Sequence, residues 1–140
     1  MGSIALADTS AWWASRRAAA VAAEFDGAVR DGDIATCRVV FFELLRSVRD
    51  ATEFVPRRDA LDALRDLPIR RREWDRAADV MQALAERGPL HHRLVGFPDL
   101  VIAAAAESAD VPVLHYDRDF ELIAEVTGQP MRALAPLGSL

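Results

Sequence analysis

Short apolar segments alternate with helical segments along the whole chain, and this alternation constrains the fold more than any other feature of the sequence. Short apolar runs indicate buried strands, whereas apolar residues at helical spacing indicate helices. Strands that alternate with helices favour a parallel sheet covered on both faces. The predicted fold class is therefore α/β, a three-layer α/β/α sandwich with a central parallel sheet. Strands are expected at 4–7, 34–37, 111–116 and 131–134, and helices through 12 and 13 and at 18–30, 39–49, 57–67, 72–87, 99–109 and 119–127.

Prolines and glycines set several of the expected boundaries. Pro68 is expected to stop the helix at 57–67, and Gly88 and Pro89 close the helix at 72–87. The segment 90–97 is expected to be a loop. The helix at 99–109 is apolar on nearly all sides, which predicts that it is fully buried.

The length of 140 residues fits one domain, and no linker divides the chain, so a single domain is expected at 1–140. No apolar run approaches the roughly 18 residues that a membrane span needs. The first residues have no basic region and no long apolar stretch, so we expect no signal peptide. Cys37 is the only cysteine, which excludes an intrachain disulfide. These features are typical of a cytoplasmic protein.

Aspartates follow or open several of the expected elements. Asp8 ends the first strand, Asp99 opens the apolar helix, and Asp117 and Asp119 follow the third strand. Each of them has an ordinary explanation, because an Asp at a helix start caps the helix or stabilises its dipole. Taken together they are harder to explain in this way, because ligands of parallel sheets bind beyond the carboxyl ends of the strands. We expect the fold to bring these side chains to one edge of the sheet.

Glu43 lies inside the apolar run 39–45. An unpaired carboxylate is very costly to bury, so Glu43 must face water or a partner. One interpretation is a solvent-facing stripe that also includes Arg46 and Asp50. The other is that Glu43 joins the aspartates.

Carboxylates that gather at one site repel and raise each other's pKa. A hard divalent cation relieves this repulsion, and oxygen ligands suit Mg²⁺ or Mn²⁺. Such an ion polarises a phosphodiester and activates a water molecule. The net charge of −5 argues against ordinary nucleic-acid binding, but it becomes −1 when four site acids are left out.

Four short motifs in this order resemble PIN-domain nucleases, and specifically the VapC-type toxins of type II toxin–antitoxin pairs. The order and spacing of the motifs extend over the whole chain. The matching pieces are Ala7-Asp8-Thr9-Ser10-Ala11-Trp12, Glu43 within its apolar helix, Pro98-Asp99-Leu100-Val101-Ile102-Ala103-Ala104, and Leu114-His115-Tyr116-Asp117-Arg118-Asp119-Phe120.

The resemblance implies a metal-dependent endoribonuclease that hydrolyses phosphodiester bonds in single-stranded or structured RNA, such as transfer or ribosomal RNA. It implies that Asp8, Glu43 and Asp99 are acids of the metal centre and that Ser10 is the small hydroxyl beside the first of them. It also implies a homodimer that is inhibited by an antitoxin, whose basic tail occupies the active-site groove.

The fourth acid is either Asp117 or Asp119. Asp117 is the first residue past its strand, so we predict that it is the main metal ligand. Asp119 stands just before an apolar helix and is predicted to cap it, with a supporting role for a metal ion. Arg93 is a candidate for contacting substrate phosphate from the rim of the groove, and His91 and His92 fit an ordinary solvated turn.

Two alternatives remain open at the level of sequence. One is another Mg²⁺-dependent phosphoryl-transfer domain. A phosphoaspartate hydrolase would place an Asp two residues after Asp8, where Ser10 stands, and a receiver domain would need a lysine, which the chain lacks. The second alternative is a catalytically silent PIN-like domain that binds a protein partner.

Overall fold

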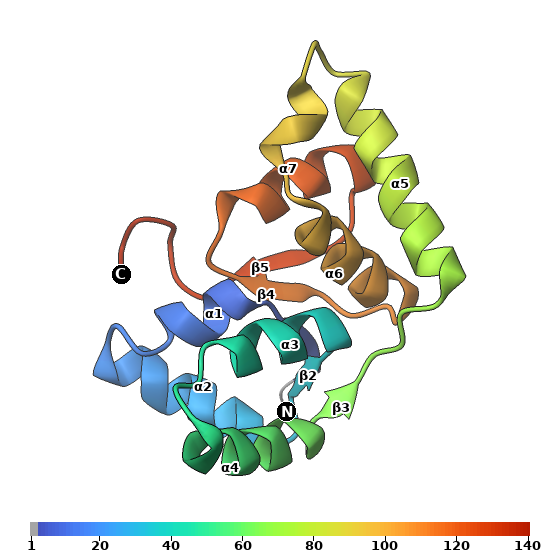
Figure 1. Ribbon diagram of the computed structural model, residues 1–140. Helices are drawn as coiled ribbons and strands as arrows, with labels where there is room; N and C mark the ends of the chain where they lie inside the picture. Colours follow the sequence, from blue (N-terminus) through green and yellow to red (C-terminus); the bar gives the residue numbers. More distant parts are fainter. Residues whose placement is uncertain (1–2) are drawn as a thin grey trace.

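Five parallel strands form the central sheet of the computed structural model, which describes residues 3–140 (Figure 1). Residues 1 and 2, which belong to the predicted domain 1–140, lie outside the described residues. The strand order is β3-β2-β1-β4-β5, and every neighbouring pair is parallel. The strands are β1 (Ala5–Ala7), β2 (Ile34–Thr36), β3 (Arg65–Asp66), β4 (Val113–His115) and β5 (Met131–Ala133).

Helices cover both faces of this sheet. Alternate side chains of β1 point to opposite faces, as a strand requires: Leu6 enters the larger core, and Ala5 and Ala7 enter the smaller one. The larger core includes residues of α3, α5, α6 and α7, and the smaller one residues of α1 and α2. The predicted three-layer α/β/α sandwich is therefore confirmed. The helices are α1 (Thr9–Ala14), α2 (Ala19–Arg30), α3 (Arg38–Arg46), α4 (Ala51–Asp62), α5 (Arg71–Ala85), α6 (Phe97–Ser108) and α7 (Arg118–Thr127), and the 3₁₀ turn η1 spans His91–Leu94.

The region between α3 and α5 differs most from the prediction. The helix predicted at 57–67 is wrong at both ends, because α4 spans Ala51–Asp62. Asp50 starts it by accepting a hydrogen bond from the Glu53 N–H at 3.1 Å. The helix then tolerates Pro56 in its second turn, at the cost of one intrahelical hydrogen bond. The residues Arg65–Asp66 form the short strand β3, which the prediction of four strands lacked.

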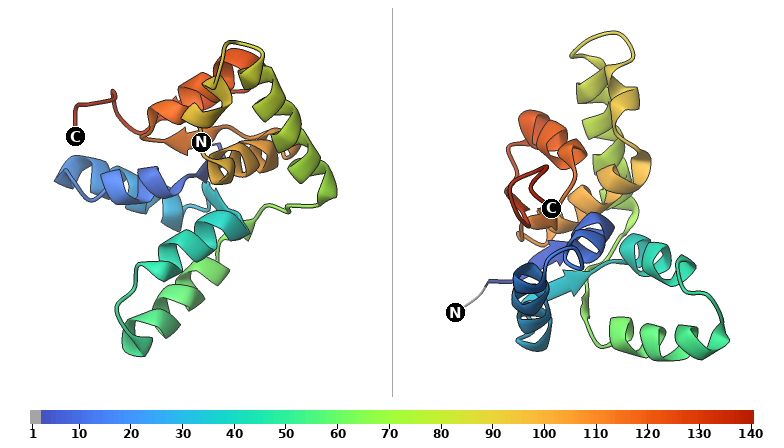
Figure 2. Two further views of the ribbon diagram at one scale, coloured as in Figure 1. Left: turned by 45° about the horizontal axis from the view of Figure 1, so that its top comes forward. Right: turned by 90° about the vertical axis from the view of Figure 1, so that its left-hand side faces the viewer.

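Other boundaries differ by smaller amounts. The helix predicted at 39–49 ends at Arg46, since the chain turns there to reach the capping residue Asp50. The predicted loop at 90–97 contains the turn η1 and the first residue of α6. In Figure 2, the α3–α4 hairpin and the α5–η1 hairpin project from the sheet in different directions.

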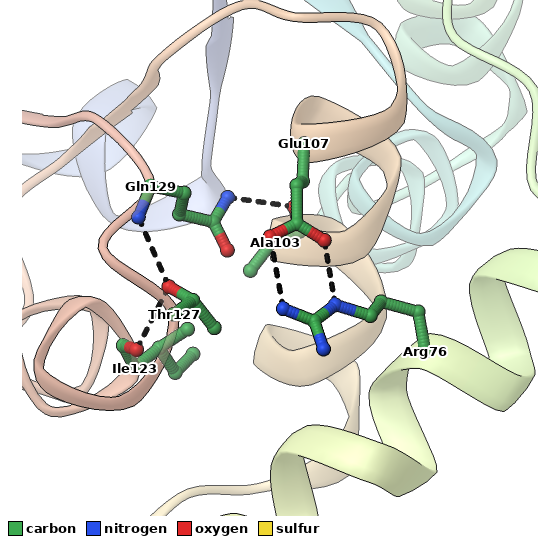
Figure 3. A network of polar contacts seen from close by, with 6 residues as sticks. All are labelled: Arg76, Ala103, Glu107, Ile123, Thr127 and Gln129. Atoms are coloured by element: carbon green, nitrogen blue, oxygen red, sulfur yellow. Dashed lines mark hydrogen bonds and ion pairs between the residues drawn. The ribbon is translucent and has the colours of Figure 1, made fainter.

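Polar contacts hold α6 between α5 and the segment that joins α7 to β5 (Figure 3). Arg76 of α5 donates two hydrogen bonds to the carboxylate of Glu107, at 2.7 and 3.1 Å. The side-chain amide of Gln129 donates to the Ala103 carbonyl at 2.9 Å. The middle of α6 is buried, as predicted, from Leu100 to Ala106. These contacts fix the position of its first turn, which carries Asp99.

The order of the strands reverses beside β1. The chain proceeds from β1 through β2 to β3 on one side, and then places β4 and β5 on the other. The register pairs Leu6 with Val113 and Ala7 with Leu114, and the Asp8 N–H donates to the Leu114 carbonyl at 2.9 Å. The carboxyl ends of β1 and β4 therefore lie side by side at the switch point, where open α/β sheets bind ligands. Among residues 3–140, none of the helices combines the length and the apolar character that a membrane span requires.

Candidate metal centre

Asp8 lies at the switch point, directly after β1. Its side chain is 4% exposed, and one carboxylate oxygen, Oδ2, accepts a hydrogen bond from the Ser10 N–H at 2.9 Å. Asp8 thus caps α1, which is the ordinary role expected of it. Burial nevertheless raises the pKa of this carboxyl group, and Asp117 raises it further. The capping bond engages Oδ2 of Asp8 and not Oδ1.

Three further carboxylates meet at the same edge of the sheet. Asp99 comes from the first turn of α6, Asp117 from the junction between β4 and α7, and Asp119 from the first turn of α7. Each offers an oxygen atom, and these three atoms lie within 4.8 Å of one another. Two segments that are distant in sequence, the start of α6 and the start of α7, therefore converge on one point.

Crowding changes the protonation of these groups. Burial is the main cause that raises the pKa of Asp99, to about 8, and the charges of Asp8, Asp117 and Asp119 add to it. Burial also raises the pKa of Asp119, and the charge of Asp117 adds to the effect. At neutral pH the cluster therefore retains a proton on Asp99, which an added positive charge would displace.

Glu43 stands at the rim of the cluster. It is exposed on α3, and its Oε1 accepts a hydrogen bond from the Thr9 hydroxyl at 2.9 Å. Partial burial raises the pKa of Glu43, and so does the charge of Asp8. Glu43 is exposed, as a solvent-facing stripe requires, and its hydrogen bond links it to the residue that follows Asp8. It does not belong to the group formed by Asp99, Asp117 and Asp119.

The predicted capping role of Asp119 is wrong. The helix α7 begins at Arg118, and Asp117 caps it by accepting the Asp119 N–H at 2.9 Å through Oδ1. A cap at Asp119 would start the helix at Phe120, two residues later than its observed start. Asp117 was preferred as the main ligand because it was predicted to be the first residue past its strand, but β4 ends at His115. Oxygen atoms of both Asp117 and Asp119 lie within 4.8 Å of one from Asp99.

Ser10 and His115 position the aspartates. The Ser10 hydroxyl accepts the Tyr116 N–H at 2.9 Å and so joins the start of α1 to the end of β4. His115 is 1% exposed, and its Nδ1 accepts the Asp117 N–H at 3.2 Å. Burial lowers the pKa of His115, which favours the neutral ring that this hydrogen bond needs. The only sign of this role in the sequence is that His115 ends a strand, two residues before Asp117.

The structure does not bring the other basic candidates into the cluster. Arg93 is exposed in η1 and forms no ion pair with any carboxylate among the described residues. His91 and His92 lie in the same turn and are half-buried. Neither histidine belongs to the three-aspartate group.

The donor set fits a hard divalent cation. All the candidate ligands are carboxylate oxygens, which suit Mg²⁺ or Mn²⁺ better than softer metals. The charges of Asp8, Asp117 and Asp119 disfavour the ionised form of Asp99, and burial disfavours it more. A divalent cation would supply that charge at the point where the three oxygens meet.

Comparisons with known proteins agree with this geometry. The PIN domain family matches residues 5–126. Ribonuclease VapC18 of Mycobacterium tuberculosis is 40% identical over 133 residues, which are 95% of this chain and 96% of the relative. Ribonuclease VapC51 of the same species is 37% identical over 109 residues, 78% of this chain and 77% of the relative.

Among solved structures, the fold is similar to a chain in the crystal structure of VapBC2 from Rickettsia felis bound to a DNA fragment from its promoter. The TM-score is 0.67 at 14% identity, over 93% of this chain and 98% of that one. This likeness concerns the fold alone, whereas the family match and the two relatives cover most of the sequence. The chain therefore belongs to the PIN domain family and, within it, to the VapC group.

Proposed function

We propose that this protein is a metal-dependent endoribonuclease, the toxin of a VapBC-type toxin–antitoxin pair. The observation that carries the proposal is the convergence of Asp99, Asp117 and Asp119 within 4.8 Å of one another, beside the buried Asp8. The 40% identity to Ribonuclease VapC18 over nearly the whole chain supports RNA as the substrate class. In the proposal the substrate is single-stranded or looped RNA, for example in transfer or ribosomal RNA.

In this proposal, Asp8, Asp99, Asp117 and Asp119 hold Mg²⁺ or Mn²⁺. When bound, such an ion polarises the phosphodiester and lowers the pKa of a coordinated water. The protein supplies the geometry: the hydrogen bonds to Asp8 Oδ2 and Asp117 Oδ1 orient these two carboxylates before substrate arrives. Ser10 acts as a positioning residue through its bond to the Tyr116 N–H.

Glu43 is placed to accept a proton during hydrolysis. The Thr9 hydroxyl holds its Oε1, which leaves Oε2 available at the exposed rim of the site. Its raised pKa brings the group closer to neutral pH, where a general base works best. In the same proposal, the exposed Arg93 contacts a substrate phosphate from η1, just before α6 begins.

The proposal also includes a homodimer and an antitoxin. A groove lined with carboxylates attracts arginine, which pairs with a carboxylate through two parallel hydrogen bonds. We expect a basic antitoxin tail to occupy the site and to exclude RNA. Co-expression with the product of the adjacent gene should give one complex with suppressed nuclease activity, and a stable complex that cuts RNA as fast as the free toxin would contradict occlusion.

The direct test is cleavage of total RNA by the purified protein in Mn²⁺ or Mg²⁺, with and without EDTA. We expect cleavage that EDTA abolishes and that is lost in Asp99→Asn, which keeps the size of the side chain but removes its charge. Cleavage that persists equally in EDTA rules out the metal mechanism. A folded wild-type protein that binds Mn²⁺ but cuts no RNA favours a silent, partner-binding domain instead.

A further inference from the structure

Asp117 stands in a very short connection between two elements. Only Tyr116 and Asp117 lie between the end of β4 at His115 and the start of α7 at Arg118. The main chain of this connection is held twice. The Tyr116 N–H donates to the Ser10 hydroxyl, and the Asp117 N–H donates to the ring of His115. The side chain of Tyr116 offers a further group through which the fold can fix the connection.

The segment 134–140, which follows β5, reaches this side chain. Because β5 is parallel to β4, its carboxyl end lies at the same edge of the sheet as Asp117. Figure 1 shows the chain leaving the sheet there, on the side of α1. The Leu134 N–H donates to the His115 carbonyl at 2.8 Å. The Leu140 N–H donates to the Tyr116 hydroxyl oxygen, also at 2.8 Å. The segment is therefore attached to both residues that precede Asp117.

The path of this segment is defined by a turn and by packing. The Ser139 N–H donates to the Pro136 carbonyl at 3.0 Å and closes a β-turn. Gly138 is the third residue of that turn and has a φ of 86°, a left-handed value that glycine adopts readily. Four side chains of the segment are half-buried, those of Leu134, Ala135, Leu137 and Leu140. The segment therefore lies against the protein and does not extend into solvent.

The ring of Tyr116 also contacts the chain that follows α1. The guanidinium carbon of Arg17 lies 5.7 Å from the ring centroid, within the range of a cation–π interaction. Arg17 comes shortly after α1, the helix that Asp8 caps. Tyr116 thus joins the segment 134–140, the end of β4 and the region of α1, and two of these three parts carry an aspartate of the candidate metal centre.

We propose that the segment 134–140 is a strap that positions Asp117 for the metal ion, through the hydrogen bond between the Leu140 N–H and the Tyr116 hydroxyl. The inference rests on the proposed function and deepens it, because it adds Tyr116 and Leu140 as positioning residues of the proposed metal centre. Neither residue touches the ion. They act by holding a two-residue connection, so that less freedom of the Asp117 carboxylate is lost when the ion binds.

A strap that only covers the edge of the sheet would also stabilise the fold. Leu134 packs against the smaller core, so the segment contributes to stability whatever else it does. A loss of stability in a variant therefore does not distinguish the two roles. The affinity for Mn²⁺ does, because a cover of the sheet edge has no reason to change how tightly the folded protein binds the ion.

The test removes the donor and the acceptor of one hydrogen bond in the full chain. Leu140→Pro removes the N–H, whereas its matched control Leu140→Ala shortens the side chain and keeps the N–H. Tyr116→Phe removes the hydroxyl and keeps the ring that Arg17 contacts. Mn²⁺ alone is the probe, in calorimetric titrations. We expect Leu140→Pro and Tyr116→Phe each to weaken Mn²⁺ binding by about 3- to 10-fold, less than the 10- to 100-fold typical of groups that contact a metal ligand directly. Leu140→Ala should bind like the wild type.

Two further measurements sharpen the test. The double variant Tyr116→Phe/Leu140→Pro should bind Mn²⁺ no more weakly than either single variant, because both changes remove the same interaction. Cleavage of RNA by the single variants should return to the wild-type rate at saturating Mn²⁺. Urea unfolding in EDTA confirms that each variant is folded.

The outcomes separate the inference from the function on which it rests. If the wild type binds Mn²⁺ and cuts RNA, but Leu140→Pro and Tyr116→Phe bind the ion as tightly as it does or more tightly, the strap does not position Asp117 and the proposed function stands. If the two losses add in the double variant, the residues do not act through their shared hydrogen bond, and the inference is equally wrong. A wild-type protein that binds no Mn²⁺ would overturn the proposed metal centre and the strap with it.

Discussion

At the scale of single residues, Asp99 is the aspartate whose ionised form the folded protein disfavours strongly. Its pKa of about 8 lies far above the ordinary value of 3.8, first because of burial and then because of three neighbouring aspartates. The folded, metal-free protein therefore keeps a proton on Asp99 over a pH range in which the unfolded chain has released it. This difference links the stability of the metal-free protein to pH.

We predict that the metal-free protein loses stability as the pH rises from about 7 to about 8.5. A group whose pKa is raised by folding favours the folded state most below its ordinary pKa of 3.8, and that contribution is lost as the pH rises through about 8. His115 has a lowered pKa and acts in the opposite direction, but only as the pH falls below its ordinary value of 6.5. Burial raises the pKa of Cys37 from 9.0 to about 11, so its contribution is lost mainly above pH 9. The chosen window therefore reports mainly on the carboxyl groups.

Urea unfolding in EDTA at the two pH values measures this effect. Asp99→Asn removes the titrating group and should make the stability nearly independent of pH in the window. Asp110 does not belong to the aspartate cluster, so Asp110→Asn should leave the dependence of stability on pH unchanged. An unaltered slope in Asp99→Asn would show that another group is responsible.

A second prediction at this scale compares Asp117 with Asp119. Asparagine keeps the cap at position 117, whose Oδ1 is already engaged with the Asp119 N–H. Asp119 does not cap the helix, and one of its carboxylate oxygens lies within 4.8 Å of an oxygen of Asp99. We therefore expect Asp119→Asn to weaken Mn²⁺ binding more than Asp117→Asn, by about 10-fold or more, with both variants folded. Calorimetric titration with Mn²⁺ decides the order, and a larger loss in Asp117→Asn reverses the assignment.

At the scale of elements, the site depends on the junction between α1 and β4. The Ser10 hydroxyl accepts the Tyr116 N–H, and no other hydrogen bond to this N–H exists among residues 3–140. We predict that Ser10→Ala lowers the free energy of unfolding by about 1–3 kcal/mol, because it leaves a partly buried N–H unpaired. Metal affinity should fall as well, since Tyr116 directly precedes Asp117.

Urea unfolding and Mn²⁺ titration together check this prediction. Ser10→Thr retains the hydroxyl and should keep most of the metal affinity. Ser47→Ala removes a hydroxyl that donates to the Leu44 carbonyl at the end of α3, away from the aspartates, and should leave metal binding intact. A stable Ser10→Ala protein with normal Mn²⁺ affinity would remove Ser10 from the list of positioning residues.

The same scale shows what the sequence could predict. The long alternation of strands and helices predicts the layers, and the rule that ligands lie beyond strand ends predicts that the acids after β1 and β4 meet. The start of α4 could also be predicted, because Asp50 stands three residues before Glu53, as in a helix cap. Pro56 interrupts the helical pattern that follows. The strand β3 was not readable, because two exposed polar residues have no periodicity.

Other parts of the site depend on tertiary packing alone. His115 is the last residue of a strand, and only the fold shows that it is buried beside Phe120 and accepts the Asp117 N–H. The choice of cap between Asp117 and Asp119 depends on a two-residue shift in the start of α7, which is finer than sequence patterns resolve. Phe42, Trp74 and Phe97 line one surface groove, but they belong to three elements that are distant in the sequence.

At the scale of the whole molecule, the net charge of −5 is unevenly distributed. Four aspartates meet at one edge of the sheet, and three of them share an oxygen site only 4.8 Å across. Folding must bring these charges together, whereas the unfolded chain keeps them apart. A cation that binds only the folded state therefore stabilises the whole domain and not merely the site.

We predict that Mn²⁺ raises the melting temperature. At a free concentration about 100 times the dissociation constant, a ligand specific for the folded state adds about 2.7 kcal/mol to its stability. For a domain of this size, that gain corresponds to a shift of roughly 5–10 °C. Thermal melts in Mn²⁺ and in EDTA at about pH 7.5 measure it.

Asp8→Asn/Asp99→Asn should melt at or above the wild-type temperature in EDTA, because it relieves the repulsion, but should gain nothing from Mn²⁺. Asp75 lies on α5, outside the aspartate cluster. Asp75→Asn should therefore have the wild-type melting temperature both in EDTA and in Mn²⁺. A wild-type protein whose melting temperature is the same in millimolar Mn²⁺ and in EDTA would show that the aspartates do not form a metal centre.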